Sequence, residues 1–136
     1  MSDEFKDVTI IYADIKGFTD YSAGVEPKDV VTMLSALFTR FDKVCVQYSL
    51  YKVYTIGDCY VALSFFDASK RNPGKEAFNM VNMALSMIDI IREVRKEVNF
   101  DGLDMRIGLH TVYLILCFIL ICFREPSLEE LLELTS

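Results

Sequence analysis

Two amphipathic helical segments, separated by β-rich runs, leave few folds open to this chain. The apolar spacing predicts one helix from Pro27 to Tyr48 and another from Lys75 to Val98. The β-rich runs lie at residues 8–15, 51–56, 60–66 and 105–111. The order strand, helix, hairpin, helix, strand is that of the ferredoxin-like β-α-β-β-α-β motif. We therefore predict an α+β domain built on this core.

Each predicted helix has one apolar face that would pack on the sheet. In the first helix this face comprises Val30, Leu34, Leu37, Phe41, Val44 and Tyr48, and in the second it comprises Ala77, Val81, Ala84, Ile88, Ile91 and Val94. Met80, Met83 and Met87 widen the second face, and packing is their expected role. Glu76 is predicted on the opposite, polar face. The basic loop at residues 69–75 is predicted to be a solvated surface.

Two carboxylates are expected to meet at one edge of this sheet. Asp14 ends the first apolar run, and Asp58 follows Gly57 in the turn between the two central β-rich runs. In the ferredoxin-like fold the first strand lies antiparallel beside the third, so this turn reaches the end where the first strand finishes. Asp14 and Asp58 should therefore lie close together, although 44 positions separate them.

Three roles are open to such a pair of carboxylates. They are solvated turn residues, a general acid and base with different pKa values, or ligands that bridge divalent cations. Asp14 follows a strand and has no evident polar partner, which favours a cation. The segment from Gly17 to Thr19 could also present backbone N–H groups to phosphate.

The overall charge and the cysteine pattern narrow the classes of site further. The net charge of −6 at pH 7 argues against a nucleic-acid partner, whose phosphates require a basic surface, and suits a site for divalent cations. No cysteines have Cys-x-x-Cys spacing and His110 is the only histidine, so zinc is not expected. His110 is interpreted as packed or solvated, and Cys59 as a small core residue. The acidic N-terminal segment predicts an intracellular protein with reduced thiols.

Two of these segments resemble the metal-binding motifs of a known family. "YADIKGFT" followed by "YTIGDCYVAL" is similar to the motifs of the class III nucleotidyl cyclases, the adenylate and guanylate cyclase catalytic domain. The later "MRIGLHT" fits the family's order, and the resemblance covers about residues 5–111. The form "YKVYTIGDCYVALSFF" most resembles the guanylate cyclases of ciliates and their relatives. In those proteins two cyclase halves pair, and the half that carries both aspartates binds the metal.

The resemblance implies a two-metal site and a lyase reaction. Asp14 and Asp58 would hold two Mg²⁺ or Mn²⁺ ions, and Ile15 would add its backbone carbonyl. Gly17, Phe18 and Thr19 would cradle the triphosphate of GTP or ATP. The ribose 3′-hydroxyl would attack the α-phosphorus and expel pyrophosphate, giving a 3′,5′-cyclic nucleotide for intracellular signalling.

The resemblance leaves the choice of purine open. The position that often reads the purine in this family corresponds to Tyr54, whose phenol can donate or accept one hydrogen bond and so selects neither GTP nor ATP. Tyr54 and Gly57 are nevertheless counted among the predicted nucleotide-binding residues. The implied partner is a second cyclase domain, in a homodimer or heterodimer, and a parent membrane protein could hold the domain at the cytoplasmic face.

The family pattern stops after Thr111. The predicted organisation is a partial cyclase domain at 1–111 and an unrelated apolar tail with a short helix at 112–136. The asparagine and arginine that stabilise the transition state in the family are absent from this tail. The tail is interpreted as a buried strand, as a short membrane-surface segment, as an exposed aggregation-prone stretch, or as translated intron, an artefact of the gene model. The alternative function is an inactive cyclase-like fragment that binds metal and nucleotide or a partner half.

Overall fold

The computed structural model describes residues 2–65, 67 and 69–117 of this chain. The predicted order of elements is confirmed, and the segment after the first strand contains a short helix. The elements are β1 (Ser2–Lys16), α1 (Phe18–Ala23), α2 (Pro27–Gln47), β2 (Tyr51–Ile56), β3 (Cys59–Leu63), α3 (Pro73–Glu97) and β4 (Asp104–Cys117).

The four strands form one antiparallel sheet in the order β2-β3-β1-β4. β1 lies beside β3, with Ile10 opposite Leu63 and Ala13 opposite Tyr60. This is the neighbour relation that the ferredoxin-like motif requires, so the predicted α+β fold is confirmed. It also brings the β2–β3 turn to the end of β1.

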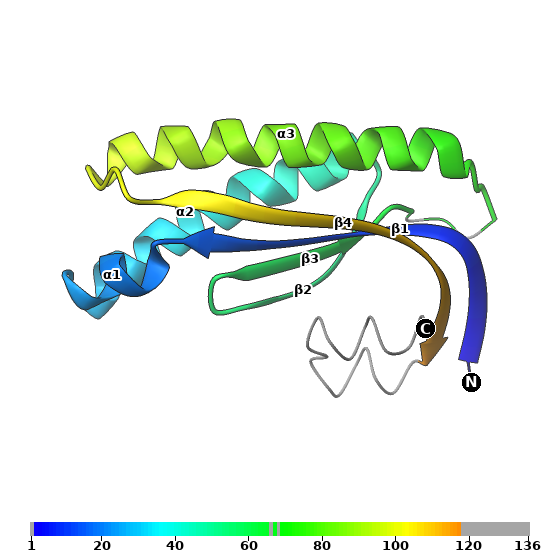
Figure 1. Ribbon diagram of the computed structural model, residues 1–136, viewed down its shortest axis with the longest axis horizontal. Helices are drawn as coiled ribbons and strands as arrows, with labels where there is room; N and C mark the ends of the chain where they lie inside the picture. Colours follow the sequence, from blue (N-terminus) through cyan, green and yellow to red (C-terminus); the bar gives the residue numbers. More distant parts are fainter. Residues whose placement is uncertain (1, 66, 68, 118–136) are drawn as a thin grey trace.

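The long helices cover one face of the sheet (Figure 1). The main core contains alternate residues of β1 and β3, including Ile11, Ala13 and Tyr60, packed against Leu37 and Phe41 of α2 and a face of α3. Alternation with a period of two directs these strand residues to the same side, where the helices bury them.

The buried face of α3 is centred differently from the prediction. Met80, Met83 and Met87 are fully buried, which confirms their packing role, whereas Val81 is 48% exposed. The methionines therefore form the middle of the buried stripe and do not merely widen it. Unbranched methionine side chains can fill irregular space against the sheet. The predicted stripe was centred instead on alanine, valine and isoleucine positions.

A second apolar cluster lies on the opposite face of the sheet. It consists of Val8, Ile10, Val61, Leu63 and Phe65, all buried, with Tyr12, Val53 and Tyr54 packed against it. β1 therefore contributes to apolar clusters on both faces, as its continuous hydrophobic sequence indicates.

β1 and β4 pair over most of their length. The ladder runs from Lys16 opposite Asp104 to Ser2 opposite Cys117, with an irregularity in β1 before Val8. β4 therefore continues past Thr111, where the predicted domain ends. The remainder of the predicted tail, residues 118–136, lies outside the described part of the chain. No helix within the described part is both long and apolar enough to cross a membrane.

Candidate functional site

The end of β1 and the turn between β2 and β3 form one edge of the sheet. One step beyond the pairing of Ala13 with Tyr60, the antiparallel register brings Asp14 level with Cys59. Asp58 precedes Cys59 in the turn. Gly57 has φ +53° and Asp58 does not have positive φ, which is the pattern of a type II′ hairpin turn. The expected meeting of Asp14 and Asp58 at one edge therefore agrees with the register.

The Cys59 thiol lies among the charged side chains of this edge. Burial raises the pKa of the Cys59 thiol, while its hydrogen bond to the Tyr12 hydroxyl, at 3.6 Å, lowers it. The carboxylates of Asp58 and Asp14 raise this pKa further, and the Arg106 guanidinium lowers it. Both carboxylates and Arg106 therefore contribute to the electrostatic environment of this thiol.

Asp14 has a cationic partner, so the expectation that it lacks a polar partner was wrong. Arg106 of β4 is directly opposite Asp14 of β1. Its Nε donates to Asp14 Oδ1 at 2.9 Å, and its Nη2 donates to Oδ2 at 3.2 Å. The local sequence around Asp14 does not reveal this partner, because it is 92 residues away and is brought near only by the β1–β4 ladder.

Arg106 is the residue at this edge that the motif comparison missed. The sequence does contain a signal for it, since Arg106 is the one residue with a full charge in the predicted strand 105–111. The ferredoxin-like order places that strand beside the first one. Counting the register from both strand ends would have brought Arg106 to the level of Asp14.

The carboxylates at this edge fit a hard divalent cation that completes its coordination with other oxygen atoms. No group of three or more His, Cys, Asp or Glu side chains is gathered in the described part of the chain. Among those same residues, the Asp58 carboxylate has no hydrogen bond or ion pair. Mg²⁺ commonly binds one or two carboxylates and fills its other positions with water and substrate phosphates. One free carboxylate beside another that is neutralised by a guanidinium matches that requirement.

Gly17 joins β1 to α1 where the chain packs closely against another loop. It has φ +82°, and a Cβ atom added to it would lie 2.4 Å from the carbonyl oxygen of Gly102. Packing thus explains this glycine without any ligand. Phe18 packs against the main core and Thr19 is exposed. The phosphate contacts expected of these three residues stay predictions.

Tyr54 lies in the row of side chains next to the carboxylates. It pairs with Val61 of β3, which also pairs with Tyr12 of β1. Burial raises the pKa of Tyr12, and Cys59 and then Tyr54 raise it further. Tyr54 is half-buried on the face without helices. Its expected role in reading the purine stays a prediction.

His110 lies away from the carboxylates. It is opposite Ile10 in the β1–β4 ladder, two rows of side chains from Arg106 on the same face, and it is exposed. This placement agrees with its interpretation as a solvated residue. The sequence likewise described Cys59 as a core residue, but Cys59 is half-buried among charged groups.

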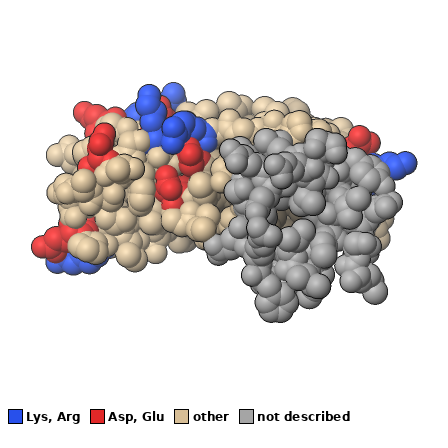
Figure 2. Space-filling view, turned by 60° about the horizontal axis from the view of Figure 1, so that its bottom comes forward, with Lys and Arg blue, Asp and Glu red and all other residues tan. Residues whose placement is uncertain are grey.

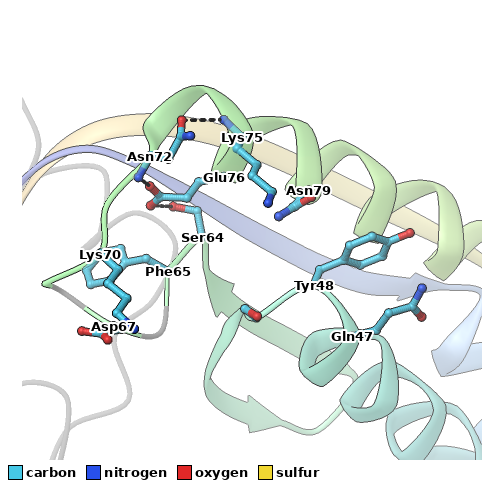
Figure 3. A pocket seen from close by; sticks show the side chains of 11 residues that line it. Gln47, Tyr48, Ser64, Phe65, Asp67, Lys70, Asn72, Lys75, Glu76 and Asn79 are labelled. Atoms are coloured by element: carbon cyan, nitrogen blue, oxygen red, sulfur yellow. Dashed lines mark hydrogen bonds between the residues drawn. The ribbon is translucent and has the colours of Figure 1, made fainter.

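A hollow of about 550 Å³ lies at the other end of the sheet (Figure 3). It is formed where α2 and β3 end and α3 begins. The lining residues include Tyr48, Phe65, Lys70, Lys75, Glu76 and Asn79. None of the predicted site residues lines it. A smaller hollow of about 290 Å³ lies between α2 and β2 and reaches Gly57 at the turn.

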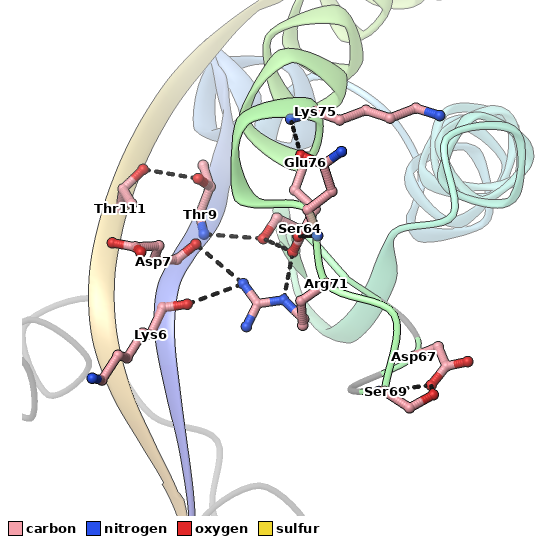
Figure 4. Close-up of polar contacts among 11 residues, drawn as sticks. Lys6, Asp7, Thr9, Ser64, Asp67, Ser69, Arg71, Lys75, Glu76 and Thr111 are labelled. Carbon is pink, nitrogen blue, oxygen red and sulfur yellow. Dashed lines mark hydrogen bonds and ion pairs between the residues drawn. The ribbon is translucent and has the colours of Figure 1, made fainter.

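Beside the larger hollow, a buried ion pair corrects two predictions (Figure 4). Glu76 was expected on the polar face of its helix and Arg71 in a solvated loop, but their side chains are only 10% and 18% exposed. Arg71 Nε donates to Glu76 Oε1 at 2.8 Å, and the backbone N–H of Asn72 donates to Oε2 at 2.7 Å. Because each charge is satisfied by the other, both can be buried.

This ion pair also connects the start of α3 to β1. Arg71 Nη2 donates to the carbonyl groups of Lys6 and Asp7, at the irregular part of β1. On the other side, the Ser64 hydroxyl donates to Glu76 and accepts from the backbone N–H of Thr9. The contacts hold the elements at this end together, which indicates a structural role.

Charged side chains of both signs gather at the end of the molecule where Asp14 and Asp58 lie. Figure 2 shows blue and red groups side by side toward the end where α1 and the end of β1 lie, with few charges over the rest of the described surface in that view. This face does not present a patch of a single sign. The arrangement suits ion pairs and a cation site better than a broad basic surface.

Comparison with known proteins gives one consistent result. Residues 1–119 match the family described as the adenylate and guanylate cyclase catalytic domain. The chain is 43% identical over 106 residues to guanylate cyclase alpha of Plasmodium falciparum, which covers 76% of this chain and 2% of that protein. It is 44% identical over 109 residues to a guanylate cyclase of Toxoplasma gondii, covering 77% of this chain and again 2% of that protein.

A solved structure supports the same relation. The dimeric guanylyl cyclase domain of the RhoGC fusion protein from the aquatic fungus Blastocladiella emersonii is similar with a TM-score of 0.70 and 28% identity. The match covers 84% of this chain and 61% of that one. The chain therefore spans a very small share of its curated relatives and less than two thirds of this solved domain.

Proposed function

The chain belongs to the adenylate and guanylate cyclase catalytic domain family, and from this premise we propose that it is the metal-binding half of a nucleotidyl cyclase domain. It would form a 3′,5′-cyclic nucleotide and pyrophosphate from GTP or ATP. GTP is the nucleotide to test first, because both named relatives are guanylate cyclases. The observation that carries the proposal is the strand register, which brings Asp14 level with Cys59, the residue next to Asp58, at one sheet edge.

In this proposal, Asp14, Asp58 and the backbone carbonyl of Ile15 hold two Mg²⁺ or Mn²⁺ ions. Oxygen ligands suit these hard cations, and the free carboxylate of Asp58 supports the assignment. When bound, divalent cations at such a site lower the pKa of an attacking hydroxyl and neutralise charge on the phosphates.

The nucleotide would lie across the turn and the start of α1. Gly17, Phe18 and Thr19 would offer backbone N–H groups to the triphosphate, because the first N–H groups of a helix have no partner within it. Gly57 would line the site at the turn, and Tyr54 would offer one hydrogen bond to the purine. These contacts position the ribose 3′-hydroxyl against the α-phosphorus.

The reaction needs no side-chain nucleophile. The 3′-hydroxyl gives up its proton to water, its oxygen bonds to the α-phosphorus, and the bond from the α-phosphorus to the pyrophosphate leaving group breaks. Catalysis of this kind depends on positioning and on neutralising negative charge. Two carboxylates that gather cations at an open sheet edge supply the means for that neutralisation.

The expected partner is a second cyclase domain, as a homodimer or as a heterodimer with a different half. The solved relative is described as a dimeric guanylyl cyclase domain, which supports this expectation. The apolar cluster on the sheet face without helices includes Tyr54 and adjoins the carboxylate row. The partner would supply the asparagine and arginine that stabilise the transition state in the family.

A second candidate function is a cyclase-like module that binds metal and nucleotide without turnover. Metal and nucleotide binding at Asp14 and Asp58 would be the same in both functions. Cyclic nucleotide formation separates the two functions. We expect little turnover from this chain alone, and turnover when a complementary cyclase half is added.

Mn²⁺-dependent GTP binding tests the assignment of the site. Calorimetry on the purified chain should detect binding that requires Mn²⁺, and Asp14→Asn or Asp58→Asn should abolish it. Asp89→Asn serves as the matched control, because Asp89 is 75% exposed on α3 and only approaches Arg92 at 3.7 Å. Binding that is unchanged in both site variants would refute the metal assignment.

A further inference from the structure

Arg106 of β4 forms an ion pair with Asp14 of β1. The pair is bidentate, with hydrogen bonds of 2.9 and 3.2 Å to the two oxygen atoms of one carboxylate. Every oxygen that Asp14 could offer to a metal ion therefore already accepts a hydrogen bond from the guanidinium. Asp58, on the other side of Cys59, has no such partner among the described residues.

The exposure of the pair makes this contact exchangeable. The Arg106 side chain is 66% exposed and the Asp14 side chain is 28% exposed. Ion pairs that are open to water favour the paired state by only roughly two- to fivefold. Arg106 can therefore move into solvent without leaving a charge buried, and Asp14 can accept another cation in its place.

We propose that Arg106 is a displaceable internal counter-ion, which holds the Asp14 carboxylate in the metal-free state and competes with the divalent cation for it. This inference rests on the proposed function, since it assumes that Asp14 is a metal ligand. It assigns a role to a residue of "MRIGLHT" for which the predicted site had none. The consequence is that metal affinity without nucleotide is held below the value that the two carboxylates alone would give.

Removing the guanidinium should therefore strengthen metal binding. In Arg106→Gln, Asp14 no longer has a competing partner and the positive charge beside the metal is gone. We expect the Kd for Mn²⁺, measured without nucleotide by calorimetry, to fall roughly five- to tenfold. Arg106→Lys should give an intermediate value, because an ammonium keeps the charge but loses the bidentate fork.

Arg92→Gln is the matched control for the loss of one positive charge. Arg92 is 60% exposed and lies on α3, where its partner Asp89 is 3.7 Å away. Its removal should leave the Kd for Mn²⁺ unchanged. Circular dichroism and thermal unfolding should show that all three variants remain folded, since each replaced side chain is mostly in solvent.

A second measurement follows the displacement itself. The Nε–H of Arg106 is hydrogen-bonded to Asp14, so before metal is added its exchange with water should be slowed roughly two- to fivefold. Titration with Mg²⁺, which is diamagnetic, should shift that signal and remove its protection. The midpoint should match the Mg²⁺ affinity measured by calorimetry.

The outcomes separate this inference from the proposed function. Tighter Mn²⁺ binding in Arg106→Gln, with no change in Arg92→Gln, supports the inference. If Asp14→Asn still abolishes binding but Arg106→Gln binds Mn²⁺ no better than the unmodified chain, Arg106 is not a competitor and the proposed function stands. If Asp14→Asn and Asp58→Asn both bind Mn²⁺ normally, the proposed function fails and this inference fails with it.

Discussion

Two of the arginine–carboxylate pairs in the described part of the chain lie at opposite ends of the sheet. Arg71 and Glu76 have side chains that are 18% and 10% exposed, whereas those of Arg106 and Asp14 are 66% and 28% exposed. The distance from Nε to the carboxylate is nearly the same, 2.8 Å in the first pair and 2.9 Å in the second. Geometry alone therefore does not distinguish them, but their surroundings do.

The buried pair is held by several other contacts. Glu76 also accepts from the backbone N–H of Asn72, and Arg71 donates to two carbonyl groups of β1 and stacks 4.3 Å over the Phe65 ring. Removing one partner of such a pair leaves a buried charge uncompensated, so the pair is needed for the stability of the fold. The exposed pair can open at little cost, so its carboxylate can change partners. A functional carboxylate is expected to have this second kind of environment.

Replacing the arginine by glutamine should break either pair, but with very different effects on the free energy of unfolding. Arg71→Gln leaves Glu76 buried without its cation, and we expect the free energy of unfolding to fall by about 3 kcal/mol. Arg106→Gln removes a pair that water already screens, and the expected change is about 0.5 kcal/mol or less. Urea unfolding followed by circular dichroism measures both. Equal losses would mean that the two pairs do not differ as their burial indicates.

Two glycines near the exposed pair should also differ in stability when replaced. Gly17→Ala places a Cβ atom 2.4 Å from the Gly102 carbonyl oxygen in a backbone with φ +82°, so we expect a loss of about 2 kcal/mol or more. Gly57→Ala has φ +53° but no atom within 4 Å of the new Cβ, so a loss of about 1 kcal/mol is expected.

The same unfolding assay measures this difference. If Gly57→Ala costs as much as Gly17→Ala, the close approach of Gly17 to Gly102 is not what requires glycine there. The result would then point to the backbone conformation alone as the constraint at both positions.

The smallest expected effect concerns the Cys59 thiol, which reports on the charges around it. Burial first, and then the carboxylates of Asp58 and Asp14, raise its pKa, so at pH 8 less of it is thiolate than in an ordinary exposed cysteine. Removing either negative charge should lower that pKa. Alkylation of Cys59 by iodoacetamide should therefore become roughly two- to threefold faster in Asp58→Asn and Asp14→Asn.

Mass spectrometry of the Cys59 peptide identifies the reacting thiol, and Asp89→Asn again serves as the distant control. An alkylation rate that does not change in either site variant would place the carboxylates farther from Cys59 than the strand register indicates. This experiment tests the geometry of the edge without any metal or nucleotide.

The sequence was sufficient for the order of the elements and for the convergence of Asp14 and Asp58. Both follow from the periodicity of the two long helices and from the Gly57–Asp58 turn, which are local signals. The strand order of the motif then brings the end of β1 to that turn. Local patterns combined with one topological rule therefore predicted the edge of the sheet where the site is proposed.

The partners of the charged side chains could not be predicted in the same way. Arg106 meets Asp14 through the register of the β1–β4 ladder, and Glu76 is buried because Arg71 reaches it from the preceding loop. The helical pattern classifies each residue as apolar or polar and therefore assigns Glu76 to the surface. It takes no account of a partner such as Arg71, which neutralises the carboxylate and allows it to be buried. The buried face of α3 also differs from the predicted face, because three methionines occupy its centre.

The direct test of the central claim is a crystal structure of the chain with Mn²⁺ and 3′-deoxy-GTP, a GTP analogue that cannot cyclise. We predict anomalous scattering from manganese between the carboxylates of Asp14 and Asp58, with the triphosphate beside Gly17, Phe18 and Thr19. Nucleotide bound without manganese at that edge, or manganese bound at the hollow lined by Lys70 and Glu76, would contradict the assignment of the site.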